Sequence, residues 1–160
     1  MRLAILSDIH GNVLALDAVL RDLKDAGGAD KLWILGDLVA YGSRPIECLA
    51  RVRELKDAQV IAGNTDRYVF NGARPRPGGA KDEAEWQARL QAFYTRDANF
   101  NWTASQLSFA DYEYFAKLRP ELDIEAPDYG WVIGYHGAPG NDEAVLLPSL
   151  AIHEDSVVVA

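Results

Sequence analysis

A carboxylate and an imidazole stand two residues apart near the N-terminus, at Asp8 and His10. They directly follow the apolar run 3–7, which is long enough for a β-strand and too short for a helix. Because residues two apart in a strand point to the same side, both side chains can converge beyond the end of the strand. Carboxylate and imidazole together suit Mn, Fe, Zn, Co or Ni. A helix-capping Asp and a surface His would produce the same sequence, so this triplet alone is weak evidence for a metal site.

Further polar side chains follow later strand-like runs of the sequence. Asp37 comes shortly after the run 31–35, Asn64 after a run that ends at residue 62, and His136 after a run that ends at residue 134. Each of them alone could cap a helix or fill an ordinary turn. Together they indicate one site, because parallel strands bring their carboxyl ends to one edge of a sheet, where open α/β sheets place ligands.

The first third of the chain alternates strand and helix patterns. Asn12 can cap a helix whose apolar residues recur at helical spacing as far as Gly27-Gly28. Pro45 suits the first turn of a second helix, which runs to about residue 56. Strand, helix, strand, helix, strand with short links is typical of an α/β fold with parallel strands. Cys48 falls inside the second helix, where we expect it to serve as a small apolar filler.

The rest of the chain predicts a helical excursion over about 81–117, after a loop rich in Gly and Pro. Within it we expect one helix to about residue 97 and two short ones over 103–107 and 111–118. The excursion would cover the sheet or its open edge. No shift in composition marks a boundary, so we expect one domain over 1–160.

Strand character returns after the helical excursion. Two strands over 121–125 and 131–135, joined by a turn at 128–130, predict a hairpin. A last strand is predicted over 156–160, where the chain ends.

The composition excludes several classes of protein. A chain of 160 residues with a formal charge of -8 suits one globular domain, and we expect no stable nucleic-acid binding, since phosphate backbones are held by Lys and Arg. That objection weakens if some acidic side chains hold divalent cations. No apolar run approaches the ~20 residues of a membrane span, and the N-terminal run is too short for a secretory signal. We therefore expect a cytoplasmic protein.

Four short motifs, taken in order, resemble the signatures of the calcineurin-like metallophosphoesterases, and the resemblance covers essentially the whole chain. The similarity is greatest to the small bacterial and archaeal phosphodiesterase branch. It implies a β-sandwich flanked by helices, with two divalent metal ions (Mn, Fe, Zn, Ni or Co) at the carboxyl ends of the strands. The motifs are Asp8-x-His10, Gly36-Asp37 with Gly42, Gly63-Asn64-x-Asp66 and His136-Gly137.

The same resemblance implies a role for each of the five residues. Asp8 and His10 bind the first metal, Asp37 bridges both, and Asn64 and His136 bind the second. These five residues are the expected metal ligands and the expected catalytic set. The implied reaction is direct hydrolysis of a phosphate-ester substrate by a metal-bound hydroxide that attacks phosphorus in line with the leaving oxygen. Two cations ~3.5–4 Å apart need a shared anionic ligand, which agrees with the bridging position.

One family motif is missing from the sequence. Relatives complete the site with a Gly-His-x-His turn after one more strand, and the only other histidine here is His153, which we expect on the surface. The strand 156–160 is of the kind that leads into that turn. We therefore expect a C-terminally incomplete fold, from a fragment of a longer gene product, in which each metal lacks one imidazole. An exposed strand edge favours self-association, so a homo-oligomer is a further expectation.

Two positions bear on the reaction itself. Many relatives carry His where this chain has Thr65, and threonine cannot act as a general acid at neutral pH. We therefore expect a preference for substrates with good leaving groups. Asp66 could orient its neighbours or be a plain turn residue, with similar weight.

Other positions bear on the substrate. Phosphoprotein phosphatases of the superfamily place an Arg where this chain has Ala40-Tyr41, so phosphodiesters are favoured over phosphoproteins. Arg67 and Arg44 could contact phosphate, but a solvated surface charge is the expected state of each. The aromatic side chains in the helical excursion have helical spacing, so we expect core packing rather than base stacking for Trp86, Phe93 and Tyr94.

Two alternatives to an enzyme remain. The first is a non-catalytic scaffold or binding module that uses the same fold after losing metal ligands. Five retained ligands argue against it for the parent protein. The second is a doubly wound nucleotide-binding domain, which is disfavoured because no glycine-rich phosphate loop follows the first strand.

Overall fold

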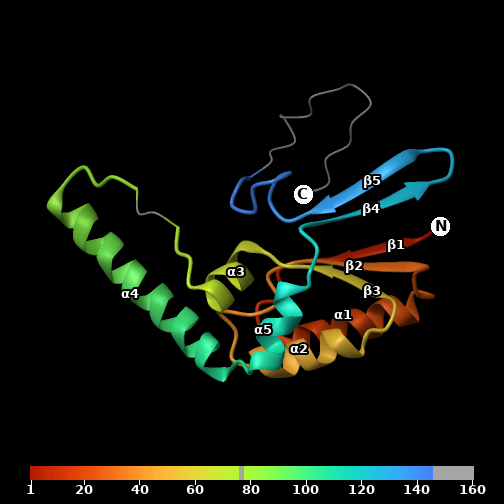
Figure 1. Cartoon of the computed structure of the whole chain (residues 1–160), viewed down its shortest axis with the longest axis horizontal. Helices are drawn as coiled ribbons and strands as arrows, with labels where there is room; N and C mark the ends of the chain where they lie inside the picture. Colours follow the sequence, from red (N-terminus) through yellow and green to blue (C-terminus); the bar gives the residue numbers. More distant parts are fainter. Residues whose placement is uncertain (76–77, 146–160) are drawn as a thin grey trace.

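The structure, a computed structural model, describes residues 1–75 and 78–145. Strands and helices alternate in the first half, three helices follow one another in the middle, and a hairpin comes last (Figure 1). In chain order the elements are β1 (Leu3–Leu6), α1 (Val13–Asp25), β2 (Lys31–Leu35), α2 (Pro45–Glu54), β3 (Ala58–Ile61), α3 (Asn64–Asn71), α4 (Glu83–Gln106), α5 (Phe109–Ala116), β4 (Glu121–Ala126) and β5 (Gly130–Tyr135).

The centre of the fold is a parallel sheet with the strand order β1-β2-β3. The middle strand β2 has two consecutive buried side chains, Trp33 and Ile34, because both faces of the sheet are covered. Ile34 belongs to the larger core under the helices, whereas Trp33 packs with Ile61 and Leu122 under the hairpin. The sheet therefore separates two apolar layers.

Helices cover one face of this sheet. α1 begins after Asn12, whose side chain accepts the N–H of Ala15, and α2 has Pro45 in its first turn, as predicted. Cys48 of α2 is buried, as expected for an apolar filler. The apolar faces of the helices meet the sheet in the larger core, which contains Leu16, Ile34, Leu49, Val52, Val69, Phe100 and Phe115.

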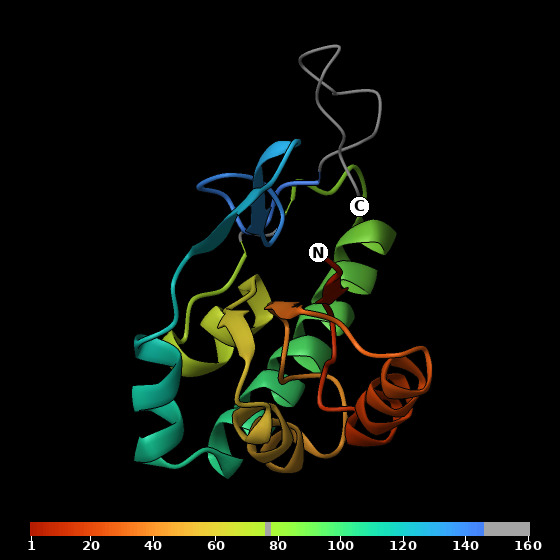
Figure 2. The ribbon, with the colours of Figure 1, turned by 90° about the vertical axis from the view of Figure 1, so that its right-hand side faces the viewer.

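The antiparallel hairpin β4-β5 covers the opposite face. Figure 2 shows the hairpin above the sheet and the helices below it. The approach is close at Gly134, where an added Cβ would lie 2.8 Å from the ring of Trp33. The predicted β-sandwich flanked by helices is thus confirmed, and so is the predicted hairpin.

The helical excursion differs from the prediction in two respects. One continuous helix, α4, runs for 24 residues where a break was expected before residue 103, because neither Gly nor Pro interrupts the sequence and Phe100 and Thr103 are both buried near its end. Trp86 and Tyr94 are exposed rather than packed in the core, since only the C-terminal part of α4 lies against the body of the molecule.

The segment after β3, for which an ordinary turn was the alternative to a site, forms the helix α3 (Asn64–Asn71). Gly63 precedes this helix, and the side chain of Asp66 accepts the N–H of Gly63 in the manner of a capping box. The predicted last strand over 156–160 and His153 lie outside the described residues. Among the described residues, none of the helices combines the length and apolar character that a membrane crossing requires.

The loops after β2 and β3 touch through their backbones at Gly36. Its φ is +89°, and an added Cβ would meet the backbone nitrogen of Gly63 and lie 2.6 Å from its Cα. We expect Gly36→Ala to lower the free energy of unfolding by roughly 2–5 kcal/mol, from left-handed strain plus overpacking. Urea denaturation measures the loss.

Gly28→Ala is the matched control for this substitution. Gly28 also has a left-handed φ, +73°, but nothing lies within 4 Å of its added Cβ. It should lose only the strain contribution of about 1–2 kcal/mol. Equal losses in the two variants would show that the close approach of Gly36 to Gly63 adds no cost beyond the left-handed strain.

Candidate metal centre

All five predicted ligands come together at the carboxyl edge of the sheet. Nε2 of His10 lies 3.5 Å from Oδ1 of Asp8 and 3.6 Å from Oδ2 of Asp37. Nε2 of His136 lies 3.6 Å from Oδ1 of Asp37 and 3.0 Å from Oδ1 of Asn64. The two oxygens of Asp37 thus face two different imidazoles, and its carboxylate lies between two sets of ligand atoms.

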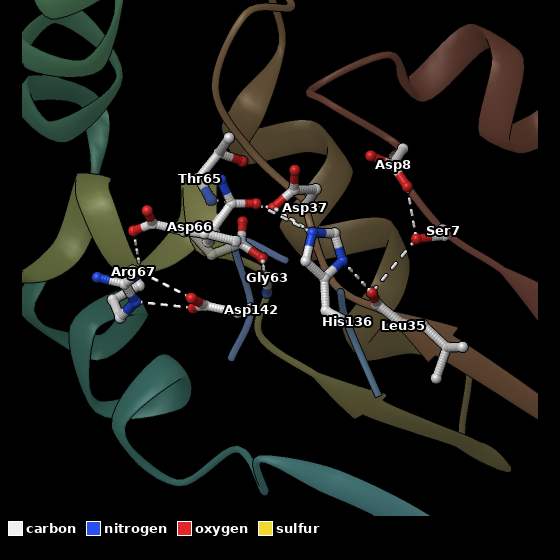
Figure 3. A network of polar contacts seen from close by, with 12 residues as sticks. Ser7, Asp8, Leu35, Asp37, Gly63, Thr65, Asp66, Arg67, His136 and Asp142 are labelled. Carbon is white, nitrogen blue, oxygen red and sulfur yellow. Dashed lines mark hydrogen bonds and ion pairs between the residues drawn. The ribbon is translucent and has the colours of Figure 1, made fainter. Parts of the chain in front are cut away.

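The imidazole rings are oriented by backbone carbonyls. Nδ1 of His136 lies 2.7 Å from the carbonyl oxygen of Leu35, and Nδ1 of His10 lies 3.4 Å from that of Val39 (Figure 3 draws the first contact). A carbonyl accepts only from N–H, so these contacts favour a proton on Nδ1, and in that tautomer each Nε2 would present a lone pair to a metal ion.

This donor set fits a metal ion. Each Nε2 lone pair faces carboxylate or amide oxygens, which also present lone pairs, so a cation between them would relieve their mutual repulsion. Candidate ligand atoms of Asp8, His10 and Asp37 all lie within 4.8 Å of one another. Imidazole with carboxylate oxygen suits divalent Mn, Fe, Co, Ni or Zn better than Ca.

The backbone of the two loops that carry the site is strained. Apart from Asp128 in the hairpin turn, every non-glycine residue with a positive φ in residues 1–75 and 78–145 lies in the loops after β1 and β2. Such a conformation costs about 1–3 kcal/mol per residue and is often found at functional sites. These residues are Asp8, His10, Asp37, Ala40 and Tyr41.

Two backbone contacts hold the strained loops together. The N–H of His10 donates to the carbonyl of Asp37 at 2.8 Å, and the N–H of Gly11 donates to that of Leu38 at 2.9 Å. The Ser7 hydroxyl donates to Oδ2 of Asp8 at 2.6 Å and so directs the more exposed carboxylate. The positions of both aspartates are therefore set by contacts within the protein.

Asp66 holds the loops after β2 and β3 in place. It is fully buried and accepts the N–H groups of Leu38, Val39 and Gly63 at 2.9–3.1 Å. Burial raises the pKa of the Asp66 carboxyl to about 6, while the N–H donors lower it. Of the two roles considered for Asp66, these contacts favour the orienting one over a plain turn residue.

Thr65 and Arg67 flank this carboxylate. The N–H of Thr65 donates to Oδ1 of Asp37 at 3.0 Å, and its hydroxyl is buried with no hydrogen-bond partner among the residues that the structure describes. The Arg67 guanidinium makes two 2.7 Å bonds to Asp142 and one of 2.8 Å to Glu143 (Figure 3 labels Asp142). The expectation that Arg67 is a solvated surface charge is wrong, because the loop after β5 supplies carboxylates that pair with it.

Two cavities adjoin the site, and Tyr41 lines both. The first, about 500 Å³, contains Asn64 and His136. The second, about 400 Å³, contains Asp8 and His10, together with the exposed Arg44. Tyr41 therefore separates two spaces that reach the same group of ligands. Its ring packs edge-on to the ring of His10, with centroids 5.0 Å apart.

The sequence did not predict the residues that line the first cavity opposite the ligands. They come from α3, from α4 and from the loop after β5, namely Tyr68, Arg96, Asp142 and Glu143. One signal was present, because Arg96 lies three residues after Phe93 and four before Phe100 on one face of a helix. Its place beside the site depends on how α4 docks, which the sequence pattern does not give.

Comparison with known proteins shows which proteins this chain resembles. A symmetrical bis(5'-nucleosyl)-tetraphosphatase of Actinobacillus pleuropneumoniae is 37% identical over 141 residues, which are 83% of this chain and 44% of that protein. The chain spans less than half the length of the curated relatives it matches.

Two solved structures are similar over nearly all of the chain. A metallophosphoesterase from Sphaerobacter thermophilus has a TM-score of 0.64 and 30% identity, covering 95% of this chain and 54% of that one. A hypothetical protein from Pyrococcus horikoshii has a TM-score of 0.71 and 26% identity, covering 92% and 59%. The model of the calcineurin-like phosphoesterase family matches residues 1–147. With this match and the ligand motifs at the ends of its strands, the chain belongs to the calcineurin-like phosphoesterase family.

Proposed function

We propose that this chain carries the metal-binding part of a divalent-metal phosphohydrolase that cleaves phosphodiesters. Asp8 and His10 hold one ion, Asn64 and His136 hold a second, and Asp37 is shared. The observation that supports this most strongly is the position of Asp37, whose two oxygens each face a different imidazole Nε2 at 3.6 Å. Family membership supports the use of divalent metals.

Bound ions would supply Lewis acidity, which lowers the pKa of water toward ~7 and neutralises charge on phosphoryl oxygens. The protein residues do the positioning. The carbonyls of Leu35 and Val39 keep the imidazole protons on Nδ1, so that Nε2 stays free for the site. Thr65 presents no proton to a leaving group, because its hydroxyl is buried. Substrates with good leaving groups are therefore favoured.

A second candidate substrate class comes from the relatives. Several are named symmetrical bis(5'-nucleosyl)-tetraphosphatases. The cavity next to Asn64 and His136 offers aromatic rings and a guanidinium, from Tyr41, Tyr68 and Arg96. Such a lining suits a nucleotide better than a phosphoprotein segment, and it agrees with the absence of Arg at positions 40–41.

Asp37→Asn tests the proposed metal centre. The amide keeps the size of the side chain and one acceptor oxygen but removes the charge that two cations would share. We expect Mn²⁺ binding to weaken by at least about 10-fold and hydrolysis of bis(p-nitrophenyl) phosphate to fall by about 100-fold or more. Calorimetric titration with Mn²⁺ and the release of p-nitrophenol measure the two effects.

Asp123→Asn serves as the control for that variant. Asp123 is exposed on β4 and pairs with Arg119 at 2.9 Å, away from the site. It should bind Mn²⁺ and turn over substrate as the unaltered chain does. An unaltered chain that binds Mn²⁺ without turnover would leave the scaffold alternative standing. If it binds no Mn²⁺ at all, the proposed centre is wrong.

Asp66→Asn tests whether Asp66 positions the loops that carry the site. An amide offers one acceptor oxygen in place of two and brings N–H groups toward the donors of Leu38, Val39 and Gly63. We expect the free energy of unfolding to fall by about 2–4 kcal/mol and Mn²⁺ affinity by about 10–100-fold. Urea denaturation and Mn²⁺ titration give the two numbers.

The matched control is Asp111→Asn. Asp111 is also buried and accepts the N–H of Ser108 at the start of α5, and it pairs with Arg53 at 2.8 Å. This variant should lose stability without losing Mn²⁺ affinity, since it does not touch the site. Equal loss of Mn²⁺ affinity in both variants would mean that general destabilisation, and not the positioning by Asp66, controls the site.

A further inference from the structure

Arg96 of α4 is a cation in the cavity beside the ligands. It lines the same space of about 500 Å³ as Asn64 and His136, although it comes from a different part of the chain. The side chain is fixed by packing, with the guanidinium carbon 5.1 Å from the ring centroid of Phe93 and 6.0 Å from that of Phe100. A guanidinium held in this way has little conformational entropy left to lose on binding.

The charge of Arg96 is only partly neutralised. Its Nη2 lies 2.9 Å from Oδ1 of Asp97, but Nε of Arg74 lies 3.4 Å from the same oxygen. Two guanidinium groups thus share one carboxylate, which leaves about one positive charge in this cluster at neutral pH. An anion in the cavity is attracted to this side.

The loop after β5 contributes the reverse charge to the same cavity, through Asp142 and Glu143. Asp142 and Glu143 together carry two negative charges against the one positive charge of Arg67, which bonds to both. The cavity therefore attracts an anionic group to the region near Arg96. The region near the two carboxylates suits neutral hydroxyl or amino groups, which can donate to carboxylates.

Tyr41 lines the same cavity as Arg96 and contacts one of the ligands. The ring of Tyr41 lies 5.0 Å from that of His10 and 5.5 Å from that of Phe100, and the guanidinium carbon of Arg96 lies 6.0 Å from the ring centroid of Phe100. Partial burial and the charge of Asp37 raise the pKa of the Tyr41 phenol, and Arg96 lowers it. Tyr41 thus lies in the fields of both the site and Arg96.

We propose that Arg96 binds a second, non-reacting phosphoryl group of the substrate, in the cavity that Tyr41 also lines. The proposal rests on the proposed phosphohydrolase function and narrows its substrate class. It assigns this chain to esters that carry a further phosphate next to the reacting one, as in a nucleoside diphosphate or polyphosphate, rather than to simple phosphodiesters. Arg96 then takes the role of a phosphate-binding guanidinium that residues 40 and 41 cannot fill.

Binding of small phosphonates tests the proposal without turnover. The Mn²⁺-loaded chain, dialysed free of excess metal, is titrated with methylenediphosphonate and with methylphosphonate in a calorimeter. We expect the diphosphonate to bind more tightly by at least about 10-fold, because a charge-assisted bond to Arg96 is added. Arg96→Gln should abolish that preference, and Arg96→Lys should keep part of it.

Arg89→Gln is the matched control, because Arg89 lies on the same helix, pairs with Glu85 at 2.6 Å and does not line the cavity. It should keep the full preference. In turnover, Arg96→Gln should raise KM for a dinucleoside polyphosphate by about 10-fold or more, whereas Arg89→Gln should leave that KM unchanged. Circular dichroism and thermal melts of the three variants confirm an intact fold.

The outcomes separate this proposal from the proposed function. An equal affinity for both phosphonates in the unaltered chain overturns the role of Arg96, and so does a preference that survives in Arg96→Gln. Turnover of a phosphodiester together with either result would leave the proposed function intact. A preference that depends on Arg96 without any turnover would support the binding role and count against the enzyme.

Discussion

The rest of the site depends on the carboxylate of Asp37, which lies buried between two imidazoles. A buried charge is costly unless hydrogen bonds or opposite charges compensate it. Here the N–H of Thr65 contributes one hydrogen bond, and the Nε2 of an imidazole lies 3.6 Å from each of the two oxygens. The arrangement therefore suits a positive charge that lies between the side chains. This single constraint accounts for the strain and the supporting contacts around it.

Groups that repel one another stay together only if the backbone is stiff. The loops after β1 and β2 combine left-handed residues with direct backbone hydrogen bonds, and Asp66 ties the second of these loops to the loop after β3. Because a ligand that binds only the folded state stabilises it by mass action, bound cations would return part of the energy stored in this strain. Local stability and metal affinity are for that reason coupled in this family member.

The sequence predicted much of this arrangement because the relevant signals are local. A polar residue follows shortly after the end of each strand of the sheet, so the topology alone brings Asp8, Asp37 and Asn64 to one edge. The continuous α4 was not predicted, because its length follows from the burial of Phe100 and Thr103 against the body of the molecule. The ion pairs of Arg67 were not predicted either, since their partners lie 75 residues or more away. Contacts of this kind depend on how distant parts of the chain pack together, and no periodic pattern in the sequence indicates them.

A net charge of -8 at first argues against a phosphate substrate. The position of the acids reverses that argument. Asp8 and Asp37 would be neutralised by the cations they hold, so they add no repulsion at the reacting phosphoryl group. The remaining attraction must come from fixed cations near the site, and in the first cavity, among the residues that the structure describes, the guanidinium of Arg96 shares its carboxylate with Arg74. In the two proposals taken together, metal chemistry is assigned to the ends of the strands and substrate choice to α4. Substitutions in α4 can then alter the substrate without disturbing the metal ligands.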